Sequence, residues 1–356
     1  EDYHFLLQFT PNKFYHGVEH ANSSVICIGP GKELSKPEYY NELMGVSSHE
    51  LFHAWNICNI RPTELMPYNF SQQAMFATGY VAEGFTTYYG DLFLVRSKLF
   101  DKTWYLNELN KLFNRHFLNF GRLNNSVIDS SIDLWVDGYQ PSAPHKKSSI
   151  YVEGAMIALT LDLLIRKNTG NSRSLDDVMR ILYDRYGKTR KGYIHKDIKT
   201  ICEEVANQNL EDYFNDYIDG TKPKEDLVSG LLESVGCELE ISDSAFLLEK
   251  ALGLKVFFDT GECKIVQIAP GSIGESLFSL RDKITSINGE KVTEEYLKQL
   301  KPGALEFQVE RNFKLKEVSV VTEGGSFIKR YGIIQKKSPN AKQKDSFQSW
   351  LNVSFD

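Results

Sequence analysis

The sequence predicts an α+β fold in which two β-rich regions flank a mainly helical one. Short runs of apolar and aromatic residues, broken by turn residues, occupy the first 36 positions and predict a small β-sheet. Segments with apolar residues at helical spacing follow as far as residue 220, and short β-type runs alternate with turns from residue 250. A chain of 356 residues is long enough for two or three domains.

These patterns divide the chain into four regions. We predict a first domain at 1–228 (β-rich over 1–36, mostly helical over 37–228), a linker at 229–249, a β domain at 250–325 and a C-terminal extension at 326–356. The first strands are expected at 3–9 and 24–28, because both runs are apolar and Pro11 and Asn12 interrupt the sequence between them.

Helices should fill most of the first domain. The spacing predicts helices at about 37–56, 73–98, 103–120, 150–168, 174–186, 195–207 and 209–219. The helix at 174–186 has the clearest boundaries, since Ser174 and Asp177 form a capping-box pair and Gly187 ends it. Residues 121–149 are polar and turn-rich, so we expect a long loop there, with His145 as a solvated loop histidine rather than a substrate contact.

The β domain is predicted from four short runs. They lie at 252–257, 264–268, 283–287 and 305–309, and Asn288-Gly289 is a tight-turn signal after the third.

Composition excludes several classes of protein. Hydrophobic residues make up 42% and charged residues 25%, as in ordinary globular proteins, and a net charge of −6 argues against a nucleic-acid-binding surface. Residues 155–165 are apolar but too short for a transmembrane segment and contain Asp162. We expect a soluble protein. The sequence does not distinguish a cytoplasmic protein from a periplasmic or a secreted one. Five scattered cysteines argue against a disulfide framework.

The strongest chemical signal lies at residues 49–53, which read His-Glu-Leu-Phe-His. On a helix, His49 and His53 lie one turn apart on the same face, so both imidazoles can reach one metal ion. Glu50 can then contact a water that the metal polarises, and this pattern is a signature of zinc peptidases. The alternative is a chance match, in which these are two ordinary histidines of a helix.

A zinc site of this kind needs a third protein ligand. The best candidate is Glu83, in an apolar and aromatic helix where an ionised carboxylate is costly unless it is paired or bound to metal. Glu64 is the other carboxylate considered, but it lies in a Pro-rich loop. Cys58 could be a soft ligand, although a small buried apolar role is favoured.

Several segments together resemble the glycyl aminopeptidase family of gluzincin zinc metallopeptidases. They are His-Glu-Leu-Phe-His-Ala-Trp-Asn at 49–56, Ile-Arg-Pro at 60–62, Glu-Gly-Phe-Thr at 83–86, Gly-Val-Glu-His at 17–20 and Tyr-Val-Glu-Gly at 151–154. Segments 161–166, 174–179, 214–220, 269–273 and 283–289 extend the resemblance over nearly the whole chain. It implies a thermolysin-like catalytic domain followed by a PDZ domain. Since such proteins usually carry a further β-rich domain in front, we expect this sequence to be a piece of a longer one.

The resemblance also implies roles for individual residues. One Zn²⁺ per chain would be held by His49, His53 and Glu83, with Glu50 as the proton carrier. Tyr151 would donate to the oxyanion, with Tyr139 in reserve. Gly17 and Glu19 would bind substrate, Glu19 through the α-ammonium group.

The resemblance has two departures. Glu153 stands where the family usually has Lys, and His16 replaces the first glycine of the strand motif. Asn56 and Arg61 are expected to fix the metal-binding helix and the loop after it. In the β domain, the loop 252–254 would hold the C-terminus of a peptide, unless the groove there is unused.

The function predicted from the sequence is therefore a zinc-dependent aminopeptidase acting on peptides, with a preference for N-terminal Gly or Ala implied by the resemblance. One alternative is a zinc endopeptidase. Another is a PDZ-based peptide-binding protein with a vestigial metal site. No nucleic-acid partner or membrane span is expected, and no oligomeric state is predicted.

Overall fold

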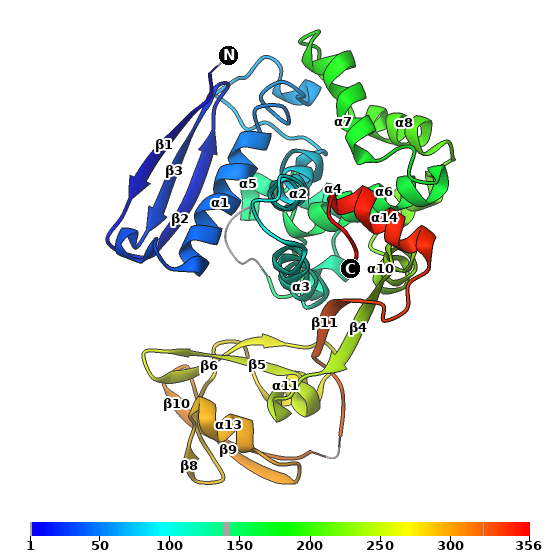
Figure 1. Cartoon of the computed structure of the whole chain (residues 1–356). Helices are drawn as coiled ribbons and strands as arrows, with labels where there is room; N and C mark the ends of the chain where they lie inside the picture. Colours follow the sequence, from blue (N-terminus) through cyan, green and yellow to red (C-terminus); the bar gives the residue numbers. More distant parts are fainter. Residues whose placement is uncertain (1, 138–142, 323) are drawn as a thin grey trace. The chain divides into compact units, whose positions relative to one another are not determined.

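The computed structural model describes residues 2–137, 143–322 and 324–356, and the chain forms two compact units (Figure 1). Unit 1 contains residues 1–239 and 333–356, and unit 2 contains residues 240–332. The chain leaves unit 1 within β4 (Cys237–Asp243) and returns within β11 (Lys329–Gln335), and these two strands pair with each other. The predicted mixture of helix and strand is confirmed.

Unit 1 begins with a three-stranded sheet. Its strands are β1 (His4–Phe9), β2 (Phe14–Glu19) and β3 (Ser23–Gly29), in the order β1-β3-β2. The central strand β3 runs parallel to β1 and antiparallel to β2, so β2 forms one edge of the sheet. Ile26 and Ile28 of β3 are fully buried and pack against Val46 of α1 (Pro37–Phe52).

The rest of unit 1 is helical. It contains α2 (Thr86–Arg96), α3 (Lys102–Phe117), α4 (Val127–Ile132), α5 (Leu134–Asp137), α6 (Val152–Thr169), α7 (Leu175–Leu182), α8 (His195–Ala206), α9 (Glu211–Tyr217), α10 (Glu225–Leu232) and α14 (Ala341–Leu351). Two π-helical turns are η3 (Tyr80–Phe85) and η5 (Tyr183–Gly187), and the 3-10 turns are η1 (Gly31–Glu33), η2 (Thr63–Leu65), η4 (Phe120–Leu123) and η6 (Glu233–Val235).

Helix α6 is the centre of this unit. Most of its residues are buried and apolar, as expected for a helix covered on all sides, and it contacts α2, α3, α7, α8, α10 and η3. The approach of η3 to α6 is very close. A Cβ added to Gly84 would come within 2.9 Å of the amide nitrogen of Ala155 and closer still to Gly154, so glycines are required at this crossing.

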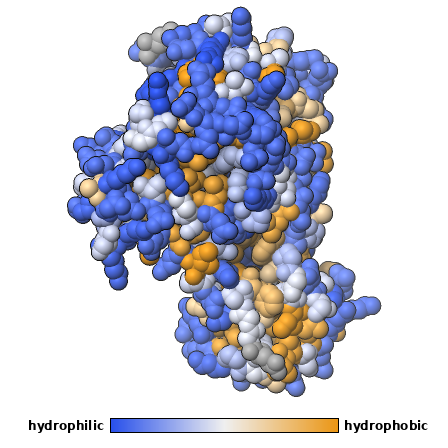
Figure 2. All heavy atoms as spheres, turned by 90° about the vertical axis from the view of Figure 1, so that its right-hand side faces the viewer, coloured by the Kyte–Doolittle hydropathy of each residue, from blue (hydrophilic) through white to orange (hydrophobic). Residues whose placement is uncertain are grey.

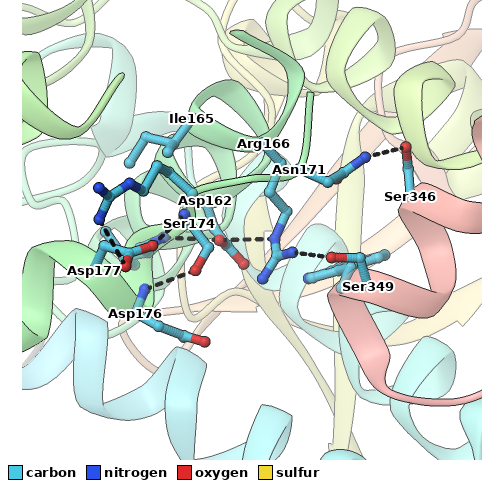
Figure 3. Close-up of polar contacts among 12 residues, drawn as sticks. Asp162, Ile165, Arg166, Asn171, Ser174, Asp176, Asp177, Ser346 and Ser349 are labelled. Atoms are coloured by element: carbon cyan, nitrogen blue, oxygen red, sulfur yellow. Dashed lines mark hydrogen bonds and ion pairs between the residues drawn. The ribbon is translucent and has the colours of Figure 1, made fainter. Parts of the chain in front are cut away.

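The C-terminal residues 333–356 belong to unit 1, whereas the sequence suggested a separate extension from 326. Trp350 of α14 is fully buried, and its Nε1 donates to the hydroxyl of Tyr88 at 2.9 Å. Arg166 and Asn171 donate to Ser349 and Ser346 of α14, at 2.9 and 2.8 Å (Figure 3). Sequence reasoning missed this packing because these three partners of α14 lie more than 170 positions earlier in the chain.

Three local predictions also differ from the structure. The region predicted as a linker, 229–249, contains the end of α10, the turn η6 and strand β4. The long loop predicted at 121–149 contains the short helices α4 and α5, and Ser126 with Asp129 forms the capping box of α4. The helix expected from residue 73 begins only at Tyr80, since residues 69–71 form a turn in which Ser71 N–H donates to the side chain of Asn69.

Unit 2 contains an antiparallel sheet whose strands differ in length. Its elements are α11 (Leu247–Leu252), β5 (Leu254–Asp259), β6 (Glu262–Ile268), α12 (Ile273–Leu277), β7 (Lys283–Ile287), β8 (Glu290–Lys291), α13 (Glu294–Gln299), β9 (Ala304–Arg311) and β10 (Lys314–Val321). The strand order is β10-β9-β7-β6-β5, with β8 beside β7, so β5 lies at an edge. Alternate residues of these strands build one apolar core with α11 and α13.

Within the described residues, no helix is both long and apolar enough to cross a lipid bilayer.

Candidate metal centre

Three side chains from two elements converge on one point in unit 1. His49 lies in the last turn of α1, His53 caps that helix, and Glu83 lies in the π-helical turn η3. The two Nε2 atoms are 3.1 Å apart, and Oε2 of Glu83 lies 3.5 Å from His49 Nε2 and 3.4 Å from His53 Nε2.

These distances fit a tetrahedral metal ion. With metal–ligand bonds of about 2.0–2.1 Å, the ligand atoms of a tetrahedral zinc site lie about 3.3–3.4 Å from one another. The three measured separations lie close to that value. The donors, two imidazoles and a carboxylate, are also the set expected of a catalytic zinc site, which leaves a fourth position open.

The protonation of these groups suits a metal ligand set. Burial opposes ionisation of Glu83, but hydrogen bonds from His49 and His53 outweigh it and lower the pKa of the carboxyl to about 2. Burial also lowers the pKa of His49. At His53 burial is outweighed by the bond to Glu83, and the pKa rises to about 9. A metal ion must therefore displace a proton from His53 at neutral pH.

Glu50 lies beside this centre with its carboxylate buried. It is 5% exposed, and burial raises its pKa to about 7. Strand β2 passes directly over the carboxylate, so that a Cβ on Gly17 would lie 2.6 Å from the carboxyl carbon. The hydroxyl of Tyr3 donates to the main-chain oxygen of Glu50 at 3.0 Å, which further ties the sheet to α1.

Glu19, at the end of β2, brings a second carboxylate to the same place. One of its oxygens lies within 4.8 Å of ligand atoms of both Glu50 and His53. A half-buried carboxylate beside a metal centre provides a site for a cationic group of a bound molecule.

Tyr151, at the start of α6, lies next to the ligands. Its ring stacks on that of His49 with a centroid separation of 6.4 Å and an interplanar angle of 24°. The crossing of η3 and α6 therefore places Glu83 and Tyr151 near the same imidazole. Tyr139 lies outside the described residues.

Glu153, the residue that departs from the family pattern, lies away from the metal centre in the interior. Its carboxylate contacts Nδ1 of His116 at 2.8 Å and pairs with the ammonium group of Lys224, and all three side chains are buried. Burial opposes ionisation of Glu153, but Lys224 and His116 outweigh it and hold its pKa far below the usual range.

The other residues singled out from the sequence do not join the metal centre. Among the described residues, neither Glu64 nor Cys58 belongs to a group with metal-ligand spacing. Burial raises the pKa of the Cys58 thiol to about 11, so it stays protonated. The ring of His145 contacts Phe120. Arg61 donates to the main-chain oxygens of Ile57 and Cys58 and thus holds the loop after α1.

Two contributions were not visible in the sequence. The first is the fit of Gly17 over Glu50, which follows from the pairing of β2 with β3. The second is the side chain of Asn56, which reaches the helix of Glu83. From the sequence, Asn56 was expected to fix the metal-binding helix and the loop after it, but not to contact the segment of Glu83.

Comparison with known proteins finds one similar fold and one family model that matches part of the chain. The chain superposes on the crystal structure of an aminopeptidase N family protein from Idiomarina loihiensis with a TM-score of 0.86 over 98% of its length, at 23% sequence identity. It spans 62% of that protein. Residues 42–157 match the model of the M61 glycyl aminopeptidase family, the same family that the sequence motifs resemble. No curated protein sequence matches the chain.

Proposed function

We propose that the protein is a zinc-dependent aminopeptidase that removes N-terminal residues from peptides. The observation that carries the proposal is the spacing of His49, His53 and Glu83, whose ligand atoms lie 3.1–3.5 Å apart, beside the buried Glu50. A bound Zn²⁺ would act as a Lewis acid on the scissile carbonyl and lower the pKa of water.

The chain's own residues carry the protons. Glu50 accepts the proton of the attacking water on its carboxylate and then passes it to the leaving amine. A pKa of about 7 suits both halves of this task, because the group can bind and release a proton at neutral pH. The hydroxyl of Tyr151 donates to the developing oxyanion.

Glu19 gives the enzyme its preference for a free N-terminus. Its carboxylate accepts charge-assisted hydrogen bonds from the substrate's α-ammonium group, which places the first peptide bond at the metal. Gly17 leaves room for the substrate backbone along the free edge of β2 and for Glu50 below it. A preference for a small first residue, Gly or Ala, is part of the proposal and rests on the family.

The fold supports the same proposal at a coarser level. We propose that unit 1 is a thermolysin-like catalytic domain and unit 2 a PDZ-like domain. The proposed catalytic domain has other boundaries than those predicted from the sequence, because residues 229–239 and 333–356 belong to unit 1.

The test is digestion of a pool of short peptides by zinc-loaded protein, analysed by mass spectrometry. Wild type should release single N-terminal residues, Gly and Ala fastest, and Glu50→Gln should release none. Glu64→Gln, which removes an exposed carboxylate outside the metal centre, should behave as wild type. Cleavage within peptides that Glu19→Gln leaves unchanged would indicate an endopeptidase instead.

A second function, peptide binding, is favoured by a cavity in unit 2. It has a volume of 190 Å³ and is lined by Phe246, Leu248, Glu249, Leu254, Val256, Phe257, Phe258, Glu294, Leu297 and Lys298. Apolar side chains also gather on the face of unit 2 seen in the lower part of Figure 2. The edge strand β5 lines the cavity, so we propose that an extended peptide pairs with β5 and inserts an apolar side chain.

Whether that peptide binds through a free C-terminal carboxylate can be tested directly. A C-terminal carboxylate would need amides of the loop 252–254, yet Gly253 N–H already donates to Leu248 and caps α11. Binding of fluorescent peptides with a free or an amidated C-terminus should be compared. Val256→Asp should abolish binding and Val266→Asp, on β6 outside the cavity, should not. Peptide binding without hydrolysis by wild type would favour a vestigial metal site.

A further inference from the structure

Asn56 is fully buried between the two chain segments that carry the metal ligands. It lies three residues after His53, in the turn that follows α1, and it faces the π-helical turn that contains Glu83. Its main chain and its side chain each contact a different side of the metal centre.

The main-chain oxygen of Asn56 contacts His53. It lies 3.0 Å from Nδ1 of the imidazole, which is the geometry of an Nδ1–H donor. An acceptor at Nδ1 fixes the tautomer in which Nε2 carries the lone pair, and it also fixes the plane of the ring. Nε2 is the atom that faces His49 and Glu83.

The side-chain amide of Asn56 contacts the segment of Glu83. Nδ2 donates to the main-chain oxygens of Val81 at 2.7 Å and Ala82 at 3.2 Å, and to Oγ1 of Thr86 at 3.0 Å. Val81 and Ala82 directly precede Glu83, and Thr86 follows it by three residues. The hydroxyl of Thr86 in turn donates to Ala82 at 2.6 Å, so the amide and the hydroxyl hold the same turn together.

The orientation of the amide is set by its surroundings. All three neighbours of Nδ2 can accept, and the two main-chain oxygens can only accept, so a carboxylate at this position would face them with like partial charge. The other atom, Oδ1, is buried and has no hydrogen-bond partner. The residue is therefore suited to this place by its donors, which Asp lacks and which a hydrocarbon side chain lacks as well.

We propose that Asn56 is a positioning residue of the metal centre, which couples the orientation of His53 to that of Glu83. A π-helical turn is rare and often occurs at functional sites, and here it is held in register with α1 by one side chain. The proposal rests on the metal centre proposed above. It assigns to Asn56 no contact with substrate and predicts an effect on metal affinity first.

The experiment measures zinc affinity by competition with a chromophoric chelator for wild type, Asn56→Asp, Asn56→Ala and Asn59→Ala. Asn59 is the matched control, because its amide donates to the main-chain oxygen of Ala54 in the same loop rather than to the turn that contains Glu83. We expect both Asn56 variants to bind zinc about 10–100-fold more weakly, as for other residues that support metal ligands, and Asn59→Ala to bind as wild type.

A second readout separates positioning from general stability. Cobalt-loaded protein has visible absorption bands that report the ligand geometry, and these bands should change in Asn56→Asp but not in Asn59→Ala. Thr86→Val removes one acceptor of Asn56 and should show a smaller change in the same direction, which keeps the test available should Asn56→Asp fail to fold.

The outcomes distinguish this inference from the proposed function. Wild type that binds no zinc would overturn the metal centre and the inference with it. Wild type that binds zinc, with Asn56 variants of equal affinity and unchanged cobalt spectrum, would overturn the role of Asn56 alone. A lower melting temperature of the metal-free variants without loss of affinity would show a structural role only.

Discussion

At the scale of single residues, the site depends on close contacts between small and charged groups. Glu50 is buried under strand β2. Position 17 of that strand is occupied by glycine, and a Cβ there would overlap the Glu50 carboxylate. This contact keeps water away from the carboxylate and so raises its pKa toward 7. A side chain at position 17 would push Glu50 out of its position.

Gly17→Ala should therefore reduce catalysis strongly. The added Cβ would lie 2.6 Å from the carboxyl carbon of Glu50, and a shift of about 1 Å in a catalytic group can cost about 100-fold in rate. Steady-state kinetics on a Gly-terminated peptide should show the loss in kcat. Gly45→Ala is the control, since a Cβ there meets nothing within 4 Å and should raise helix stability slightly. Unchanged kcat for Gly17→Ala would contradict the position of Glu50.

Zinc affinity should depend on pH through His53. Its pKa of about 9 means that the imidazole is protonated on both nitrogens, and therefore cationic, at neutral pH without metal. Metal binding must then release one of these protons. The apparent dissociation constant should then fall about tenfold per pH unit between pH 6 and 9. Chelator competition at a series of pH values measures this slope. A dissociation constant that did not change with pH over that range would show that His53 is already neutral without metal, or that it is not a ligand.

At the scale of elements, the N-terminus of α6 is tied to its neighbours by buried charges. Glu153 in its first turn joins His116 at the end of α3 and Lys224 just before α10. The same turn follows Tyr151 and carries Gly154, which contacts η3. The charges thus hold the element that presents Tyr151 to the metal centre.

Glu153→Gln should destabilise the protein by about 3–5 kcal/mol at pH 7, because it leaves Lys224 buried without its counter-charge. The pKa of Glu153 is lowered by folding, so its contribution is present above the pKa of the unfolded chain, about 4.3. It is lost as pH falls below that value. Urea unfolding at pH 7 and pH 3.5 measures the free energy of unfolding of both proteins. The difference between wild type and variant should be smaller at pH 3.5. A larger difference at pH 3.5 would contradict this assignment.

Elements with local signals were predictable from the sequence, and those set by distant contacts were not. The helix after Pro37 and the capping box at Ser174 depend on neighbouring residues, and both occur as expected. The π-helical turn η3, by contrast, contacts Asn56 and Gly154, which lie far from it in sequence. For the same reason the spacing of histidines predicted a metal site, and Asn56 was expected to fix the metal-binding helix, whereas its hydrogen bonds to the turn of Glu83 were not predicted.

At the scale of the whole chain, unit 1 is discontinuous. Residues 333–356 return to it after unit 2, and their helix α14 packs on residues from α2 and α6. No periodicity in the last 30 residues could reveal this, because these partners lie 183 and 262 positions earlier in the chain. The interior they meet is polar as well as apolar: the hydroxyl of Tyr88 accepts from Trp350 and donates to Asp162 at 2.6 Å, and Asp162 also accepts from Arg166.

Trp350→Ala should accordingly destabilise unit 1 although the residue is six positions from the end of the sequence. Removing a fully buried Trp side chain costs about 3–5 kcal/mol, and the hydroxyl of Tyr88 loses its donor as well. Differential scanning calorimetry should show a lower melting temperature for the transition of unit 1 and an unchanged one for unit 2. Trp135→Ala is the control, because that ring is more than half exposed. If both variants melted as wild type, α14 would contribute little to the stability of unit 1, and residues 333–356 would be dispensable for its folding.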